Sequence, residues 1–278
     1  MTDSLTRKPP RRGIYLLPNL FTTGAMFAGF YAIVAAYLGS FTQAAIAVFV
    51  AALLDGMDGR VARLTGTQSD FGVQYDSLSD LTSFGLAPAL VMYTWSLQYL
   101  REYGPLWSKV GWCAAFLYAA CAALRLARFN TQVGIADKRY FQGLASPAAA
   151  ALCMSFVWAM EKFRAEGYAI DGESLCFVTP VVAVVAGLLM VSRFRYFSFK
   201  AWPVGDRVPF IWIFIAVLVL VALAIDTSRV LLVLATVYAL SGVVITLWGL
   251  RSRASRRQLR IARRHPAAVP RPPTEPHP

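Results

Sequence analysis

Residues 53–80 read LLDGMDGRVARLTGTQSDFGVQYDSLSD, and the spacing of four aspartates in this stretch decides how the chain folds around it. Asp55 and Asp58 are three residues apart, and Asp76 and Asp80 are four apart, so each pair shares one face of a helix. The short, glycine-containing link between the pairs lets the two helices lie side by side and antiparallel. We therefore expect all four carboxylates to converge at one end of a helix pair.

The chain on either side of this stretch is strongly apolar. Apolar and aromatic residues make up 57% of its 278 residues and charged residues 15%, whereas a soluble domain is roughly 45–50% apolar and about 25% charged. Eight stretches approach the length of about 20 apolar residues that a helix needs to cross a bilayer. They are residues 16–39, 41–63, 76–100, 107–128, 143–161, 174–192, 208–225 and 229–250. The sequence predicts an all-α integral membrane protein with about eight transmembrane helices.

The basic residues predict how these helices are oriented. Cytoplasmic loops are enriched in Lys and Arg, and 22 of the 27 Lys and Arg residues lie in alternate connections and the two ends of the chain. Both termini and the aspartate cluster are therefore expected on the cytoplasmic side of the inner membrane. The net charge of +12 is then an orientation signal and does not require a nucleic-acid partner.

The last segment, residues 251–278, is basic and then rich in proline. It cannot build a core, and we expect it to be disordered beyond about residue 265. Its arginines could bind anionic lipid headgroups, or they could serve only to enforce the topology. The sequence leaves these two interpretations open.

The four clustered carboxylates predict a metal site. Like charges in one pocket repel strongly where the dielectric constant is low, so they stay ionised together only if cations neutralise them. A pure carboxylate site suits hard divalent cations such as Mg²⁺ or Mn²⁺. Two such ions could clamp a phosphate group and stabilise its charge during transfer.

Small residues beside the acids predict a surface for a ligand. Gly56, Gly59 and Ala62 recur every three residues, which leaves a bare stripe where a ligand can approach the backbone. Arg63 follows them, and a guanidinium suits bidentate contact with phosphate. Gly72 begins a similar opening four residues before Asp76. The alternative is that the aspartates are only helix caps and polar residues of a helix interface.

This pattern resembles the motif of the CDP-alcohol phosphotransferase family at every fixed position. The matching residues are Asp55, Asp58, Gly59, Ala62 and Arg63, then, after eight residues, Gly72, Asp76 and Asp80. The resemblance implies a six-helix membrane core that uses divalent metals. It also implies the reaction, in which a second alcohol displaces CMP from a CDP-alcohol.

The resemblance also implies a role for each residue. Asp55, Asp58 and Asp76 would be metal ligands, and Asp80 would both bind metal and act as the general base on the acceptor hydroxyl. A carboxylate beside metals can take that proton as the oxygen attacks phosphorus. The CMP site would be formed by Asp58, Gly59, Ala62, Arg63, Ser69 and Gly72. Asp70 lies outside the motif and is interpreted as a solvated loop acid.

Four further stretches resemble the membrane-bound phosphatidylserine synthases, over about residues 13–205. They are LPNLFTT (17–23), RLARFN (125–130), FQGLASPAAA (141–150) and SRFRYFSFK (192–200), with Ala145 where proline is expected. The resemblance implies CDP-diacylglycerol and L-serine as substrates, and a homodimer. It also implies a basic segment at 1–15, a catalytic core at 16–205, and two additional helices at 206–250. The same chemistry with glycerol-3-phosphate or an inositol compound is the alternative.

Serine needs a cation for its carboxylate, and Arg125 and Arg128 share one helix face at a cytoplasmic end. Arg193 and Arg195 stand at the matching end of a later span. Each arginine has the alternative explanation that it only enforces topology. Asn19 and Thr22 are a further polar pair on one face: Asn19 could cap its helix, or the pair could contact substrate at the mouth of the site.

Two other functions use part of this pattern. A cation transporter could bind its ion at intramembrane acids, but it leaves the small-residue stripe and Arg63 unexplained. A scaffold that recruits partners through the basic tail leaves the aspartate cluster unexplained. A phosphotransferase accounts for the aspartate cluster, the small-residue stripe and Arg63, and the scaffold could be at most an added role.

Overall fold

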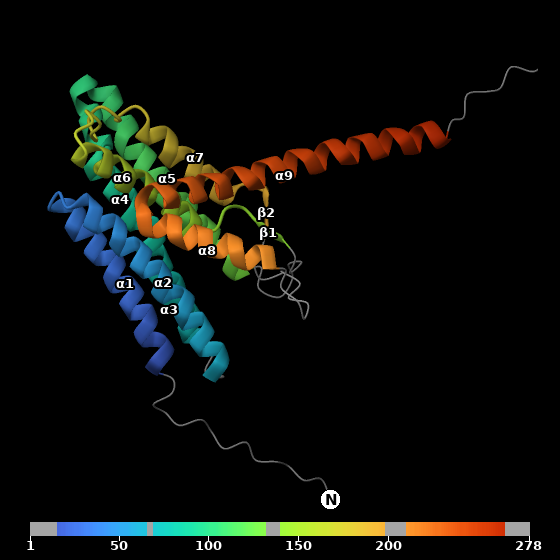
Figure 1. The fold of residues 1–278 in the computed structure, drawn as a ribbon, viewed down its shortest axis with the longest axis horizontal. Coiled ribbons are helices and arrows are strands. Elements are labelled where there is room, and N and C mark those ends of the chain that lie inside the picture. Colours follow the sequence, from blue (N-terminus) through green and yellow to red (C-terminus); the bar gives the residue numbers. More distant parts are fainter. Residues whose placement is uncertain (1–15, 66–68, 132–139, 198–209, 265–278) are drawn as a thin grey trace, which may run out of the picture.

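The computed structural model describes residues 16–65, 69–131, 140–197 and 210–264, which fold into a bundle of helices (Figure 1). The helices are α1 (Leu16–Tyr37), α2 (Phe41–Thr65), α3 (Asp70–Asp80), α4 (Ala87–Trp95), α5 (Pro105–Thr131), α6 (Ser146–Ala165), α7 (Thr179–Val191), α8 (Phe210–Ile225) and α9 (Thr227–Arg264). The segment Leu81–Leu86 is a π-helix, and Leu97–Tyr103 is a 3₁₀-helix. The predicted all-α membrane fold is confirmed, and each of the eight predicted spans contains a helix or helical run among the described residues. The sixth span, predicted from residue 174, becomes an α-helix only at Thr179.

The apolar helices differ in how well they would cross a membrane alone. Three segments of the described chain are long and apolar enough by themselves: Asn19–Tyr37, Pro105–Thr131 and Thr227–Thr246. Helices α7 and α8 are apolar but shorter. Helix α8 has no buried residue and is apolar all round, as expected for a helix that faces lipid.

Helices α1 and α2 form an antiparallel pair that packs on the π-helix through small residues. A Cβ atom added at Gly29 of α1 would lie 2.7 Å from the Cα atom of Ser83. The Ser83 hydroxyl donates a hydrogen bond of 3.0 Å to the carbonyl of Ala25. Small residues that let backbones approach, joined by a hydroxyl, are the usual contact between membrane helices. This contact fixes the helical run that contains Asp76 and Asp80 against α1.

The π-helix has a local cause in Pro88, which follows it in α4. Proline has no N–H to donate to a carbonyl one turn earlier in the helix. The N–H of Ala87 instead bonds to the carbonyl of Thr82, five residues back. The buried Tyr118 of α5 donates its hydroxyl to the carbonyl of Phe84 at 3.0 Å. A side chain from α5 therefore satisfies a backbone group within the π-helix.

We expect Tyr118→Phe to destabilise the protein, because the buried carbonyl of Phe84 loses its side-chain donor. The cost should be about 1–3 kcal/mol, the penalty for an unsatisfied buried acceptor. Thermal unfolding in detergent would measure it. Tyr31→Phe is the matched control, since among the described residues the exposed Tyr31 hydroxyl bonds only to Gln43, at 3.2 Å. An equal loss of stability in both variants would contradict the assignment.

Two three-residue strands form a small antiparallel sheet that the sequence did not predict. Strand β1 (Tyr140–Gln142) pairs antiparallel with β2 (Arg195–Phe197). Gly143 follows β1 with φ of +83°, and a Cβ atom there would lie 2.2 Å from the carbonyl oxygen of Met190. The strands are too short and too far apart in the chain to produce a local pattern. The sheet joins the segment before α6 to the segment after α7.

Helix α9 continues past the end of the last predicted span at residue 250, as far as Arg264. Residues 251–264 consist mainly of arginine, alanine, leucine and glutamine, which favour helix, and the first proline comes only at Pro266. In Figure 1 the distal part of α9 projects away from the helical body. The predicted disorder beyond about residue 265 concerns residues outside the described part.

Ion pairs join the start of α9 to the end of α6. Lys162 lies 2.9 Å from Asp226, and Arg229 lies 3.0 Å from Asp226 and also pairs with Glu166. Burial would raise the pKa of Asp226, but hydrogen bonds from Lys162, the Arg229 N–H and Ser228 lower that pKa to about 2. These contacts fix the position of α9 along α6.

Candidate active site

The end of α2 and the run formed by α3 and the π-helix bring three of the predicted aspartates together. Carboxylate oxygens of Asp55, Asp76 and Asp80 all lie within 4.8 Å of one another. Asp55 comes from α2, Asp76 and Asp80 come from α3, and α1 packs against both helices. The convergence expected from the three- and four-residue spacing is therefore present for these three.

Asp58 lies beside this group but is held differently. Its side chain is buried, and its Oδ2 accepts a hydrogen bond of 2.7 Å from the Thr22 hydroxyl. The Thr22 carbonyl in turn accepts one of 3.0 Å from the hydroxyl of Ser79 in α3. The negative charge of Asp58 nevertheless repels the negative charge of Asp76. Thr22 is thus placed as a partner of Asp58, a role that the sequence did not predict.

Two carboxylate oxygens of the cluster indicate whether a metal ion fits this site. Asp76 Oδ1 and Asp80 Oδ1 are buried, and neither has a hydrogen-bond partner among the described residues. A buried carboxylate oxygen without a partner is costly, and the mutual repulsion of the acids adds to that cost. Bound cations would remove both penalties. The donor set contains only carboxylate oxygens, which fits Mg²⁺ or Mn²⁺.

The glycines of the predicted nucleotide surface face open space. Gly56 and Gly59 are exposed, and a Cβ atom at either would meet nothing within 4 Å. The Nε of Arg63 donates a hydrogen bond of 2.8 Å to the carbonyl of Gly59. This bond holds the guanidinium beside these glycines. Ala62 lies in α2, but its side chain is outside the described part. The bare stripe expected at the end of α2 is accessible.

Ser69 and Gly72 form the start of α3. The Ser69 hydroxyl accepts a hydrogen bond of 3.0 Å from the Gly72 N–H, which is an ordinary N-cap. Asp70 is exposed in the first turn of α3 and not in a loop, where its charge favours the helix dipole. The predicted contact of Ser69 with CMP is therefore not needed to explain this residue.

Asn19 does not cap its helix, because α1 begins three residues earlier, at Leu16. Its Oδ1 lies 3.8 Å from the position that a Cβ atom of Gly72 would take. The side chain of Asn19 therefore stands at the start of α3, beside the helix that carries Asp76. This place agrees with the alternative of a polar contact at the mouth of the site.

Arg125 and Arg128 share a helix face but have different surroundings. Arg125 is half-buried, and its guanidinium donates a hydrogen bond of 3.1 Å to the Ser146 hydroxyl. The negative charge of Asp80 attracts this guanidinium. Its Nε is buried and has no partner within the described chain. Arg128 is also half-buried and bonds to Gln142 of β1. Arg125 is the one on which the charge of Asp80 acts.

The second arginine pair is less informative. Arg193 is exposed just after α7, and Arg195 opens β2, with its side chain outside the described part.

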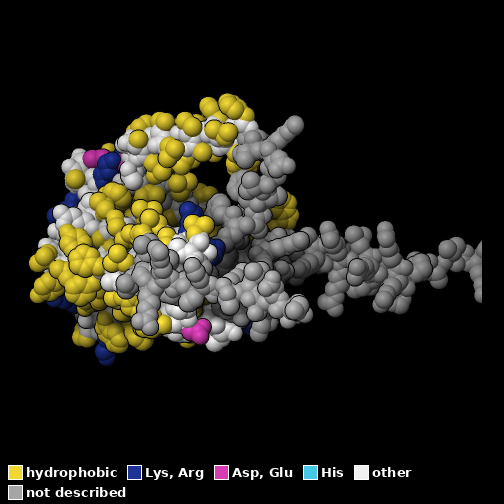
Figure 2. Space-filling model, turned by 90° about the horizontal axis from the view of Figure 1, so that it is seen from below, with side chains coloured by type: hydrophobic (Ala, Val, Ile, Leu, Met, Phe, Trp, Pro, Cys, Tyr) yellow, Lys and Arg dark blue, Asp and Glu magenta, His cyan; other side chains and the backbone are white. Residues whose placement is uncertain are grey.

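Sequence reasoning missed Ser146, which directly precedes Pro147 in one of the stretches noted above. A hydroxyl at the start of α6 was the available signal. Figure 2, seen from the side where α1 begins, shows basic side chains beside a hollow in a largely hydrophobic face.

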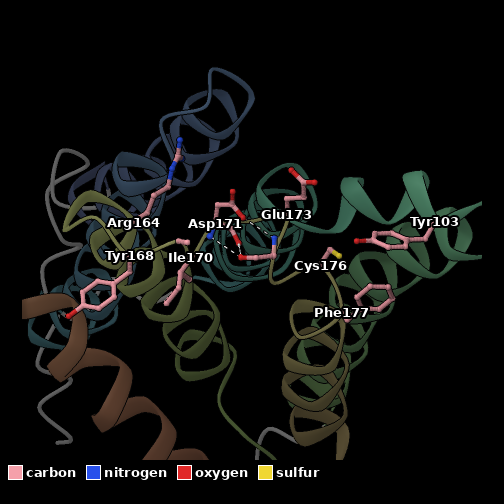
Figure 3. Close-up of a pocket in the computed structure, with 10 residues that line it drawn as sticks. Tyr103, Arg164, Tyr168, Ile170, Asp171, Glu173, Cys176 and Phe177 are labelled. Carbon is pink, nitrogen blue, oxygen red and sulfur yellow. Dashed lines mark hydrogen bonds between the residues drawn. The ribbon is translucent and has the colours of Figure 1, made fainter.

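A cavity of about 540 Å³ lies elsewhere, at the far ends of the helices. Its lining includes Tyr103, Arg164, Asp171 and Phe177 (Figure 3). Ser146, beside Arg125, and Arg164 lie at opposite ends of α6, about 27 Å apart at 1.5 Å per residue. The Ser174 N–H donates a hydrogen bond of 2.8 Å to the Asp171 carboxylate, and this bond lowers the pKa of Asp171. The cavity is therefore separate from the aspartate cluster.

Comparison with known proteins shows which family the larger part of this chain resembles. The sequence model of the CDP-alcohol phosphatidyltransferase family matches residues 15–188. A CDP-diacylglycerol–serine O-phosphatidyltransferase of Helicobacter pylori is 38% identical over 191 residues, which are 69% of this chain and 76% of that protein. One of Methanocaldococcus jannaschii is 32% identical over 197 residues, or 71% and 81% of the two chains. An archaetidylserine synthase of Methanothermobacter thermautotrophicus is 33% identical over 182 residues, or 65% and 69%.

The region matched by the family model begins just before α1 and ends within α7, so it contains every aspartate of the cluster. The motif, the convergence of its carboxylates and the similarity to these relatives agree. The chain belongs to the CDP-alcohol phosphatidyltransferase family.

Proposed function

We propose that this protein transfers the phosphatidyl group of CDP-diacylglycerol to the hydroxyl of L-serine, giving phosphatidylserine and CMP. The observation that carries the proposal is the cluster of Asp55, Asp76 and Asp80, with two buried oxygens that lack a partner, beside an open glycine surface. The relatives named for serine transfer support serine as the acceptor.

Asp55, Asp76 and Asp80, with Asp58 beside them, would hold divalent cations, for which we propose two Mg²⁺ or Mn²⁺ ions. Such cations neutralise the charge of the diphosphate and stabilise the charge that develops on the phosphoryl oxygens. Thr22 fixes the orientation of Asp58. Asp58 is buried and the other three aspartates are half-buried, and the packing of α1 against α2 and α3 would keep the carboxylates in place before substrate arrives.

The exposed stripe of Gly56 and Gly59 would let the CMP part of the substrate lie against α2, with Arg63 on a phosphate. Asp80 would take the proton of the serine hydroxyl as its oxygen attacks the phosphorus attached to diacylglycerol. The new O–P bond forms while the bond from phosphorus to the CMP oxygen breaks, so CMP leaves with the electron pair.

Arg125 is the proposed partner of the serine carboxylate. Its guanidinium is acted on by the charge of Asp80, and its Nε has a donor to offer. A guanidinium bonded to a carboxylate would hold the serine hydroxyl close to its base. Arg128, which bonds to Gln142 of β1, is the second candidate.

The site is proposed to open on the cytoplasmic side of the inner membrane, with both termini on that side. The distribution of 22 of the 27 basic residues supports this orientation. We also propose a catalytic core at 16–205 with two additional helices at 206–250, and a homodimer, both by resemblance to the family. Light scattering of the detergent-solubilised protein would determine the oligomeric state.

The purified protein is expected to release CMP from CDP-diacylglycerol only when both serine and Mg²⁺ or Mn²⁺ are present. Chelation of the metal should abolish release, because the clustered carboxylates would repel the diphosphate. Glycerol-3-phosphate and inositol compounds offered as competing acceptors would discriminate the alternative reactions. Absence of serine-dependent release would contradict the proposal, and ion flux in liposomes without CMP release would favour a transporter.

A further inference from the structure

Helix α9 extends well beyond its apolar segment. The apolar segment ends at Thr246, whereas the helix ends at Arg264. This extension, residues 247–264, lies outside the region that the family model matches, which ends at residue 188. The ion pairs that hold α9 to α6 are at the other end of α9, where the helix begins. In Figure 1 the extension projects away from the helical body.

Six arginines of the extension fall on one face of the helix. At 3.6 residues per turn, positions separated by three, four, seven, ten and eleven residues lie within about a third of the circumference. The six arginines follow this spacing, whereas Ser255, Gln258 and Ala262 fall on the opposite face. This basic stripe consists of Arg253, Arg256, Arg257, Arg260, Arg263 and Arg264.

The one-sided placement distinguishes the basic stripe from an orientation signal. Basic residues that only enforce topology need to lie near the end of a span, and they need not share a helix face. Arginines three or four positions apart on a helix repel each other. No Asp or Glu occurs between Asp226 and Glu275 to neutralise them. The stripe therefore weakens the helix that carries it unless an anionic surface lies along it.

The other residues of the extension indicate how such a surface is recognised. Leu259 and Ile261 fall on different sides of the helix. The extension therefore lacks the broad apolar face with which an interfacial helix enters a bilayer. Guanidinium groups bind phosphate through paired hydrogen bonds. A row of six arginines fits a surface that presents many phosphate groups.

The place of the basic stripe favours lipid phosphates over a soluble polyanion. Arg253 follows Thr246 by about 10 Å along the helix, close to one Debye length. An upright helix would carry Arg264 about 27 Å beyond Thr246, too far for headgroup charges to act on it. In Figure 1, however, α9 runs across the direction of α1 and α2. The extension would therefore leave the bilayer at a slant and stay near its surface.

We propose that the basic stripe of α9 binds the headgroup phosphates of anionic phospholipids at the membrane surface. Bound lipid neutralises the stripe and holds the extension against the bilayer. The inference does not depend on the proposed function. It adds to that function, because CDP-diacylglycerol and phosphatidylserine are themselves anionic lipids that would gather at the same surface.

The test uses the full-length protein in two kinds of vesicle. One contains phosphatidylcholine alone, and the other contains equal parts of phosphatidylcholine and phosphatidylglycerol, an anionic lipid that is neither the proposed substrate nor the product. Trypsin cuts after arginine, so mass spectrometry of the products measures how accessible residues 251–264 are. We expect cleavage there to be at least about tenfold slower in the anionic vesicles. Salt at about 1 M should remove the difference, because the Debye length falls to about 3 Å.

A variant of unchanged composition tests the stripe itself. Ser255→Arg with Arg256→Ser, and Leu259→Arg with Arg260→Leu, keep the net charge and spread the arginines around the helix. This variant should lose most of the protection, whereas its thermal unfolding in detergent should equal that of the wild type. Equal cleavage of the wild type in the two kinds of vesicle, or full protection of the variant, would overturn the inference. Protection that requires added RNA or polyglutamate in place of anionic lipid would also overturn it.

Discussion

Asp80→Asn is expected to reduce serine-dependent CMP release at least about 10³-fold, within the range that a general base contributes. The amide has nearly the same shape as the carboxylate, but it carries no charge and cannot accept the proton of the serine hydroxyl. Binding of CDP-diacylglycerol should be largely kept, because Gly59 and Arg63 are untouched. Radiolabelled CMP release and equilibrium binding of the CDP-lipid in detergent would measure the two effects separately.

Asp70→Asn is the matched control for this variant. Asp70 lies in the same stretch but is exposed in the first turn of α3, away from the group formed by Asp55, Asp76 and Asp80. Its loss of charge should leave CMP release unchanged. Normal turnover by Asp80→Asn would remove Asp80 as the base.

Asp55→Asn is expected to abolish activity for a different reason, the loss of a metal ligand. Without metal, this variant should unfold at a higher temperature than the wild type, because removing one of three clustered charges relieves repulsion. With Mg²⁺ or Mn²⁺ added, the wild type should gain stability, since a ligand that binds only the folded state stabilises it. The variant should gain much less.

Thermal unfolding in detergent, with and without each metal, would measure both effects alongside CMP release. Asp70→Asn again serves as the control, and it should show the same gain with metal as the wild type. A variant Asp55→Asn that keeps the full gain with metal would contradict the role of Asp55. Full activity restored by excess metal would show that Asp55 only tunes affinity.

The predictions that succeeded depend on local spacing. Runs of about 20 apolar residues specify membrane helices because the bilayer thickness is constant. Spacings of three and four residues place Asp55, Asp76 and Asp80 where their carboxylates can meet, because the helix repeat is fixed. The chain length between α2 and α3 leaves little choice but an antiparallel pair. None of these relations needs knowledge of a distant partner.

The predictions that failed or stayed open depend on partners far apart in the chain. Nothing near Pro88 indicates that Tyr118 will satisfy the carbonyl of Phe84. The pairing of β1 with β2 joins residues more than 50 positions apart. Helix α9 continues past the last predicted span to Arg264, because a change from apolar to basic residues does not by itself end a helix.

The sequence by itself determined the membrane fold, the expected orientation and the convergence of acids on neighbouring helices, because these follow from periodicity and composition. Only the tertiary structure decided that Asp58 is held by Thr22, and that Arg125 bonds to Ser146 of α6 whereas Arg128 bonds to Gln142 of β1. Residues on one helix face are equivalent in the sequence, and the neighbouring helices make them different.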